Sequence, residues 1–140
     1  MSIHPLSHAH EVLRAAKAVG VEAYLLQEYI AAQYIAAVLA RYKPWKAAGH
    51  LSIGESSRTM PTDENEFGFS RSFRGKPGYL FFEQDSRNKN TVVVISDARE
   101  LSRIMEECYG MEYFFSDEEG VFLVAVNWYV IEFTEDAFVN

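Results

Sequence analysis

Cysteine is almost missing from this chain, whose 140 residues include Cys108 and no other. A single thiol excludes an internal disulfide framework and favours a reducing compartment. The N-terminus lacks the basic region and apolar run of a secretion signal. The longest apolar stretch, residues 21–42, is interrupted by two glutamates and two glutamines, which predicts a soluble helix and not a membrane span. We therefore expect a cytoplasmic protein that does not insert into a membrane.

Basic residues are also few, and acidic residues outnumber them. The net charge is −7, whereas the footprint of a nucleic-acid-binding protein is basic, so we expect no nucleic-acid partner. The acids also concentrate at one end of the chain. From Asp97 onward the chain has eleven acidic residues and only two basic ones, Arg99 and Arg103, which gives this part a net charge of −9. The preceding residues have a net charge of +2.

Catalytic and cofactor motifs are also missing: the chain contains no Walker loop, GxGxxG, GxSxG or HExxH. This predicts neither an enzyme nor a cofactor. His4, His8 and His10 match no closed zinc-ligand set, and we expect solvated histidines on a frayed terminus, with no metal. His50 stands alone in a loop. Cys108 falls on the apolar face of a helix, where a thiol is inert.

Local signals in the first half predict two helices and a long loop. Ser7 suits an N-cap and Gly20 a left-handed C-cap for a first helix between them. A second helix over 21–42 ends before Pro44, which forbids its continuation. Residues 46–66, rich in Gly, Ser, Thr, Pro and charge, form the loop. The apolar stripe of the second helix is Leu25, Tyr29, Ala32, Ile35 or Ala36, and Leu39.

The second half predicts the strands. Three phenylalanines at even spacing indicate an edge strand over 67–73. Asp97 and Glu100 form a capping box for a helix that stops at Gly110. Residues 120–126 are apolar on both faces, which places that strand in the middle of the sheet. The remaining strands are predicted over 79–84, 91–96, 112–115 and 128–133.

Together these elements predict an α+β fold in a single domain of 1–140. It has two N-terminal helices, an antiparallel sheet of about five strands, and one helix inserted between strands.

The acids Asp117, Glu118 and Glu119 follow Phe115 closely and precede Gly120. On a short turn they are solvated, which argues against the acid–base chemistry of buried carboxylates. Two interpretations remain: a polar hairpin tip, or a surface that steers a basic partner.

Two further segments keep alternative interpretations. Trp128 and Tyr129 are either core residues of the sheet or rigid anchors at an interface. The run 71–76, RSFRGK, has three interpretations. It binds phosphates along a nucleic-acid backbone, it compensates the charge of the acidic end within the protein, or it is an edge strand whose charges prevent pairing with other chains.

Residues 100–133 resemble a family of small acidic bacterial proteins. That family pairs a short amphipathic helix and a "YGFEYY" strand with an aspartate turn, followed by "LLxxNHH" and a closing strand. Trp128 and Tyr129 replace its paired histidines, so no role of those histidines transfers. The matching positions are Tyr109-Gly110, Glu112-Tyr113, Asp117, Leu123 and Asn127.

More loosely, the whole chain is similar to the immunity proteins of bacterial polymorphic toxin and contact-dependent inhibition systems. This resemblance implies an inhibitor that binds one cognate toxin domain, such as a nuclease, as a monomer or a homodimer. The expected steering charges are Asp117, Glu118 and Glu119. Trp128 and Tyr129 are the expected anchors, and the expected charged rim is Glu132, Glu135 and Asp136.

A second hypothesis, from another class, is a small enzyme or an anion-binding domain. Its pocket would lie between the 46–66 loop and the sheet. The residues that motivate it are His50, Arg58, Arg71 and Arg74.

Overall fold

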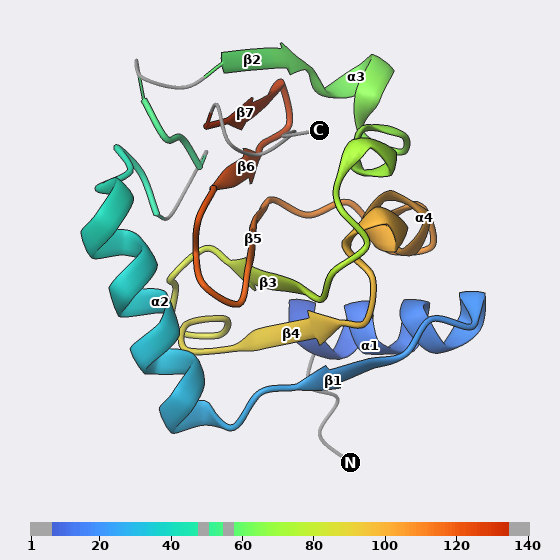
Figure 1. The fold of residues 1–140 in the computed structure, drawn as a ribbon, viewed down its shortest axis with the longest axis horizontal. Coiled ribbons are helices and arrows are strands. Elements are labelled where there is room, and N and C mark those ends of the chain that lie inside the picture. The colour runs from blue at the N-terminus through green and yellow to red at the C-terminus, as the bar shows by residue number, and fades with distance from the viewer. Residues whose placement is uncertain (1–6, 48–50, 55–57, 135–140) are drawn as a thin grey trace.

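The computed structural model describes residues 7–47, 51–54 and 58–134. Their centre is an antiparallel sheet of seven strands in the order β1-β4-β3-β5-β6-β7-β2. Figure 1 shows it from β1 at the lower edge to β2 at the upper edge. The α+β class is confirmed, but the predicted sheet of about five strands is smaller than the sheet of seven strands that forms. The strands are β1 (Ala23–Leu25), β2 (Arg58–Pro61), β3 (Gly78–Phe82), β4 (Val92–Ile95), β5 (Tyr113–Asp117), β6 (Val124–Val126) and β7 (Val130–Phe133).

Helices cover both faces of the sheet. Helices α1 (His8–Val19) and α4 (Leu101–Glu106) pack on one face, and α2 (Glu28–Tyr42) packs on the other (Figure 1). Because side chains alternate along a strand, Leu80 of β3 joins the α1 side while Phe81 joins the α2 side. The short elements are α3 (Thr62–Asn65) and the 3₁₀ segments η1 (Phe69–Ser72) and η2 (Ala98–Glu100).

The first helix forms as its local signals predict. The Ser7 hydroxyl accepts from the His10 N–H, and Gly20 closes the helix in the left-handed region with φ 77°. Both caps satisfy backbone groups that the helix itself cannot.

The second helix is shorter than predicted. Helix α2 begins at Glu28, and residues 23–25 form the edge strand β1 instead of its first turns. The predicted stripe is also wrong for Tyr29, which is 69% exposed, because Ala31, Ile35 and Val38 face the core. Pairing with the buried strand β4 outweighs the helical propensity of this segment.

The predicted long loop holds regular structure. Residues 58–61 add the edge strand β2 to β7, and α3 follows directly. Residues 51–54 lie against the sheet, where Leu51 and Ile53 are buried. The predicted edge strand over 67–73 is wrong, since η1 forms there.

The predicted strands around the inserted helix are confirmed with shifted ends. Strand β6 lies between β5 and β7, in the interior of the sheet as its double apolar face predicts. Asp97 caps η2 by accepting from the Arg99 N–H, and α4 ends at Glu106, before Gly110. The capping box is wrong, because the Glu100 carboxylate accepts from the Arg103 guanidinium instead.

No helix in the described ranges has the length and apolar character needed to cross a bilayer.

Helix α4 provides a direct test of the packing. Leu101 and Ile104 are fully buried between the helix and the sheet, so Leu101→Ala or Ile104→Ala should lower the free energy of unfolding by about 2–5 kcal/mol. Glu106→Ala, at an exposed position of the same helix, should shift it by about 0.5 kcal/mol or less. Urea unfolding measures all three variants. Wild-type stability of both core variants would contradict this packing.

Candidate functional site

The predicted acids lie on a tight turn between β5 and β6. The Gly120 N–H donates to the Asp117 carbonyl at 3.2 Å, and Gly120 has φ 66°, which glycine tolerates best. The Asp117 carboxylate accepts from the Val121 N–H at 3.1 Å. Glu118 and Glu119 are exposed at the tip. We call residues 117–120 the acidic turn.

Helix α2 holds the acidic turn in place from the side. The Tyr34 hydroxyl donates to the Asp117 carbonyl at 2.6 Å, and the Tyr42 hydroxyl donates to the Gly120 carbonyl at 2.7 Å. Burial raises the pKa of Tyr34, so its phenol stays neutral and keeps the proton it donates. The two glutamates therefore project from a fixed backbone, which lowers the entropy lost when a partner binds.

A cleft opens beside the acidic turn, with a volume of about 460 Å³. Phe73 and Phe122 stack at its base with ring centroids 5.5 Å apart, and the ring of Phe115 lies 5.4 Å from that of Phe73. We call this hollow the acidic cleft. Its lining consists of Phe73, Arg74, Lys76, Pro77, Ala98, Asp117, Glu118, Glu119, Val121 and Phe122.

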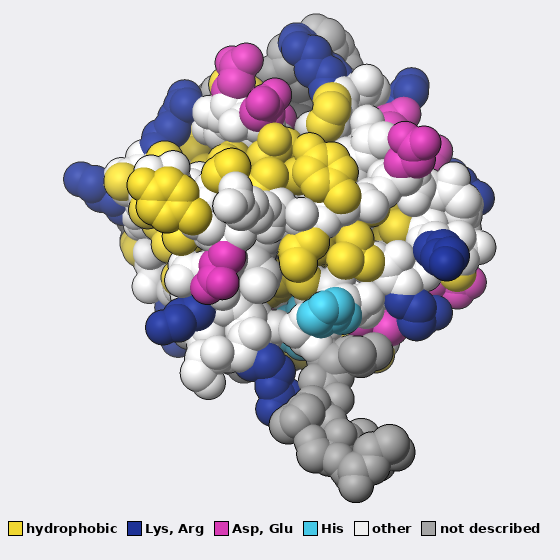
Figure 2. All heavy atoms as spheres, turned by 90° about the horizontal axis from the view of Figure 1, so that it is seen from below, with side chains coloured by type: hydrophobic (Ala, Val, Ile, Leu, Met, Phe, Trp, Pro, Cys, Tyr) yellow, Lys and Arg dark blue, Asp and Glu magenta, His cyan; other side chains and the backbone are white. Residues whose placement is uncertain are grey.

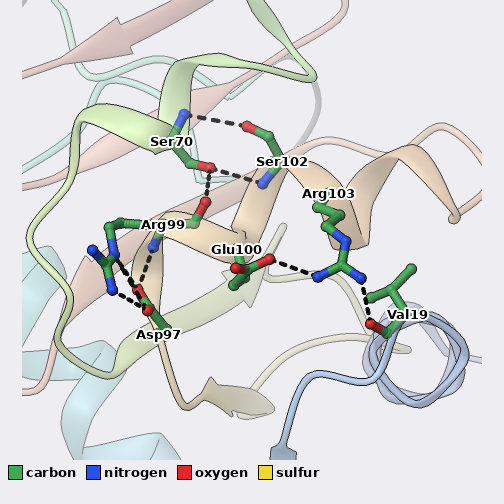
Figure 3. A network of polar contacts seen from close by, with 7 residues as sticks. All are labelled: Val19, Ser70, Asp97, Arg99, Glu100, Ser102 and Arg103. Carbon is green, nitrogen blue, oxygen red and sulfur yellow. Dashed lines mark hydrogen bonds and ion pairs between the residues drawn. The ribbon is translucent and has the colours of Figure 1, made fainter.

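A hydrogen-bond network holds the segment that precedes the cleft residues Phe73 and Arg74 (Figure 3). The Ser70 hydroxyl donates to the Arg99 carbonyl at 2.9 Å and accepts from the Ser102 N–H at 2.9 Å. The Ser70 N–H donates in turn to the Ser102 hydroxyl at 3.2 Å. These bonds tie η1 to the start of α4, and Ser70 is fully buried. They also explain why this segment does not form a strand.

The Arg99 side chain, which belongs to this network, is neutralised by an acidic neighbour. Its guanidinium pairs with Asp97 at 2.7 Å, and its hydrogen bonds hold the pKa of that carboxyl below its usual range (Figure 3). The guanidinium lies over Gly75, where a Cβ atom would come within 2.8 Å of Arg99 Nη2. Arg74 and Lys76 are therefore the cations that line the cleft itself.

The lining of the acidic cleft combines two stacked rings, two exposed glutamates and two cations. Exposed carboxylates remain solvated, so this geometry suits electrostatic attraction better than proton transfer. A long cationic side chain fits such a site, because its stem can contact the rings while its head meets a carboxylate. Asp117 contributes less directly, since one of its oxygens is used within the turn.

The predicted anchors lie at the other end of β6 from the acidic turn. Trp128 is 50% exposed and Tyr129 is 69% exposed, so neither is a core residue. The Trp128 ring rests on Gly110, where a Cβ would lie 2.8 Å from the indole. The structure therefore separates the predicted anchors from the predicted steering charges.

The prediction that places Glu132 on an exposed rim is wrong. Glu132 is only 9% exposed, and its carboxylate accepts from the Ile53 N–H and from the Ser52 hydroxyl. Its role is structural, since it binds residues 51–54 to the sheet. The other predicted rim residues, Glu135 and Asp136, lie outside the described residues.

We call the bonds that hold residues 51–54 on the sheet the clamp. Two more buried polar residues belong to it, and sequence analysis missed both. The Glu112 carboxylate accepts from the Leu51 N–H at 3.0 Å, and the Asn127 side chain donates to the Leu51 carbonyl at 3.0 Å. The sequence signal that could have indicated both residues is the position of a polar side chain inside or beside an apolar strand. The cleft residue Phe122 was also missed, because nothing local distinguishes it from a core residue.

The histidines differ from their prediction in one case. His8 is partly buried, with its ring 5.5 Å from Phe82 and its Nδ1 3.1 Å from the Tyr109 hydroxyl, so it is not a solvated terminal residue. His10 is exposed, while His4 and His50 lie outside the described residues. Within the parts of the chain that are described, no three metal-binding side chains gather.

The thiol of Cys108 is partly buried on the α1 side. Burial raises its pKa to about 12, which leaves it protonated and unreactive at neutral pH.

The arginines of the second hypothesis do not converge. Arg58 belongs to the edge strand β2, Arg74 lines the acidic cleft, and Arg71 lines a separate hollow of about 390 Å³ with Arg99 and Arg103. Those two partners are already paired, with Asp97 and Glu100 respectively.

No protein-family model, curated protein or solved structure matches the chain. The family resemblance of residues 100–133 stays a prediction.

Proposed function

We propose that the protein is an immunity protein that binds and neutralises a cognate bacterial toxin domain through the acidic cleft. The observation that carries this proposal is the rigid presentation of Glu118 and Glu119. They are exposed on a turn that Tyr34 and Tyr42 hold, beside a cleft with an aromatic base.

A nuclease toxin is the partner class that this chemistry suits best. An enzyme that cleaves nucleic acid needs a basic cleft to bind phosphates, and an acidic surface can occlude that cleft. Exposed carboxylates also accelerate the encounter with a basic protein. A toxin lysine or arginine would place its stem against Phe73 and Phe122 and its charge against Glu118 or Glu119.

Arg74 and Lys76 give the cleft a means of selecting its partner. A partner with only basic residues at this position would meet repulsion from these two cations. A basic side chain accompanied by an acidic neighbour would match both the glutamates and the cations of the cleft. We therefore expect a charge pair on the toxin surface and not a uniformly basic one.

Trp128 and Tyr129 form a second contact in this proposal. Trp128 lies eight positions after Gly120, a distance that extended chain spans in at most about 28 Å. A standard interface of about 800 Å² per partner is wide enough to cover both ends of β6. The exposed aromatic pair would then anchor the complex while the acids govern the encounter.

Expression of the neighbouring gene tests the proposed function. The C-terminal domain of the protein encoded immediately upstream is produced in a bacterial host, alone and together with this chain. We expect growth arrest by the domain alone, full rescue by co-expression, and a stable complex on gel filtration. Rescue must fail when an unrelated acidic protein replaces this chain. A non-toxic neighbour, or toxicity that this chain does not relieve, would contradict the proposal.

Reversal of the two exposed glutamates tests the site itself. Glu118→Lys with Glu119→Lys should slow association with the toxin domain and flatten its dependence on salt, because rim charges act mainly on the encounter rate. Stopped-flow binding at several salt concentrations measures both effects. Asp117 stays unchanged so that its bond to Val121 is preserved.

The matched control is Glu106→Lys with Glu107→Lys, which changes the net charge equally at the C-terminal end of α4. This control should bind faster than the turn variant at low salt. Equal slowing in both variants would show that total charge acts and that the acidic turn does not.

A further inference from the structure

One edge of the sheet presents backbone groups that make no hydrogen bond to another residue in the described part of the chain. Within the described residues, strand β1 pairs only with β4 and stands at one end of the strand order. The Leu26 N–H donates to the Val92 carbonyl, and the Ser96 N–H donates to the Glu22 carbonyl. In an antiparallel ladder the bonded positions alternate, so the even-numbered residues of β1 face β4. The N–H and C=O groups of Ala23 and Leu25 therefore point away from the sheet.

Apolar side chains surround this open edge. Tyr24 and Leu25 of β1 are 57% and 43% exposed, and Tyr29 and Ile30 in the first turn of α2 are 69% and 46% exposed. We call these four residues the edge patch. Figure 2 views the molecule from the side of β1, and hydrophobic side chains gather across the middle of that face with charged ones around them.

The opposite edge of the sheet, formed by β2, is protected against further pairing, whereas the β1 edge is not. Directly after β2, the Thr62 N–H donates to the Tyr129 carbonyl, so Thr59 and Pro61 occupy the outward positions of the strand. Pro61 has no N–H to offer to another strand, and the charged Arg58 begins the strand. Both devices discourage pairing with a further chain. Residues 23–25 of β1 carry neither proline nor charge.

We propose that β1 pairs with β1 of a second copy of this chain and forms a twofold symmetric dimer. The outward groups of Ala23 then bond to Leu25 of the other copy, and Tyr24 lies opposite its own symmetry mate. That position is a non-hydrogen-bonded pair, where facing aromatic rings stabilise the sheet. The register is symmetric about Tyr24, as a closed dimer requires.

The exposed area fits a second copy. With about 200 Å² for an aromatic side chain, the edge patch exposes roughly 400 Å², within the range of the largest patches on monomers. Two such patches and the backbone of both edges bury on the order of 1,000 Å², the lower limit for a specific interface. The pairing places the edge patch of one copy against the edge patch of the other, so each apolar surface meets another apolar surface.

The oligomeric state tests the proposal without any other ligand. Sedimentation velocity of the purified chain, extended to high concentration, should show a dimer. Leu25→Lys puts a charge at an outward edge position and should return the mass to that of a monomer, with its circular dichroism unchanged. The matched control is Thr59→Lys, the same type of change at an outward position of β2, and it should remain a dimer.

A cross-link tests the register. In a Cys108→Ser background, Tyr24→Cys places two thiols on residues whose Cα atoms are about 4.5 Å apart, within the range of a disulfide. Mild oxidation should give a covalent dimer, whereas Thr59→Cys should not. A wild-type chain that is monomeric at every concentration would overturn the proposal and leave the edge to a strand of another protein. A dimer that survives Leu25→Lys and fails to cross-link would place the interface elsewhere.

Discussion

A single methyl group added at Gly78 is expected to lower the free energy of unfolding by about 3 kcal/mol. Gly78 is buried in β3, and a Cβ at this position would lie 2.1 Å from Phe115 Cζ. The ring cannot move away freely, because Phe73 and Phe122 pack against it at centroid distances of 5.4 and 6.4 Å. Gly78→Ala must therefore displace the rings at the base of the acidic cleft as well. Urea unfolding measures the loss of stability.

Two variants make this expectation specific. Gly68→Ala adds the same methyl group where nothing lies within 4 Å, and it should unfold like the wild type. Phe115→Leu combined with Gly78→Ala restores space over the glycine, so the pair should cost less than the sum of the single changes. Strict additivity of the two changes would show that the ring and the glycine are not in contact.

The second large effect is expected at the buried clamp. Glu132→Ala should lower the free energy of unfolding by about 3 kcal/mol, since it leaves the Ile53 N–H and the Ser52 hydroxyl without their acceptor. Hydrogen exchange at the Ile53 amide should accelerate much more than exchange in β3. Glu132→Gln, which keeps one acceptor oxygen, should fall between the wild type and the alanine variant.

Glu118→Ala is the control for this series. It also removes a carboxylate, but at an exposed position of the acidic turn, and should change stability by about 0.5 kcal/mol or less. Unchanged exchange at Ile53 in Glu132→Ala would show that the clamp does not hold residues 51–54.

Features with local causes could be predicted from the sequence. Ser7 and Gly20 define the ends of α1 through groups within one turn of each end. The acidic turn follows from three acids before a glycine, a composition that favours a turn wherever it occurs. The inner strands β3 to β6 follow from apolar runs that are buried on both faces.

Features that depend on distant partners could not be predicted. Residues 23–25 have the pattern of a helix, and only the edge of β4, seventy positions away, converts them to a strand. Glu132 has the pattern of a solvent-facing residue in a closing strand. Its acceptor role becomes visible only when residues 52 and 53 return to the sheet. The rigidity of the acidic turn likewise comes from Tyr34 and Tyr42 of α2.

Strand β2 shields one edge of the sheet from pairing with other chains. It covers the outer edge of β7, whose residues Val130 and Ile131 belong to an apolar segment of high strand propensity. The clamp at Glu132 and the bond from the Thr62 hydroxyl to the Asn127 carbonyl hold the chain on either side of β2. When either anchor opens, β7 becomes a free edge that can template aggregation. Detachment of β2 is therefore a step that exposes this edge to aggregation, and the two anchors oppose it.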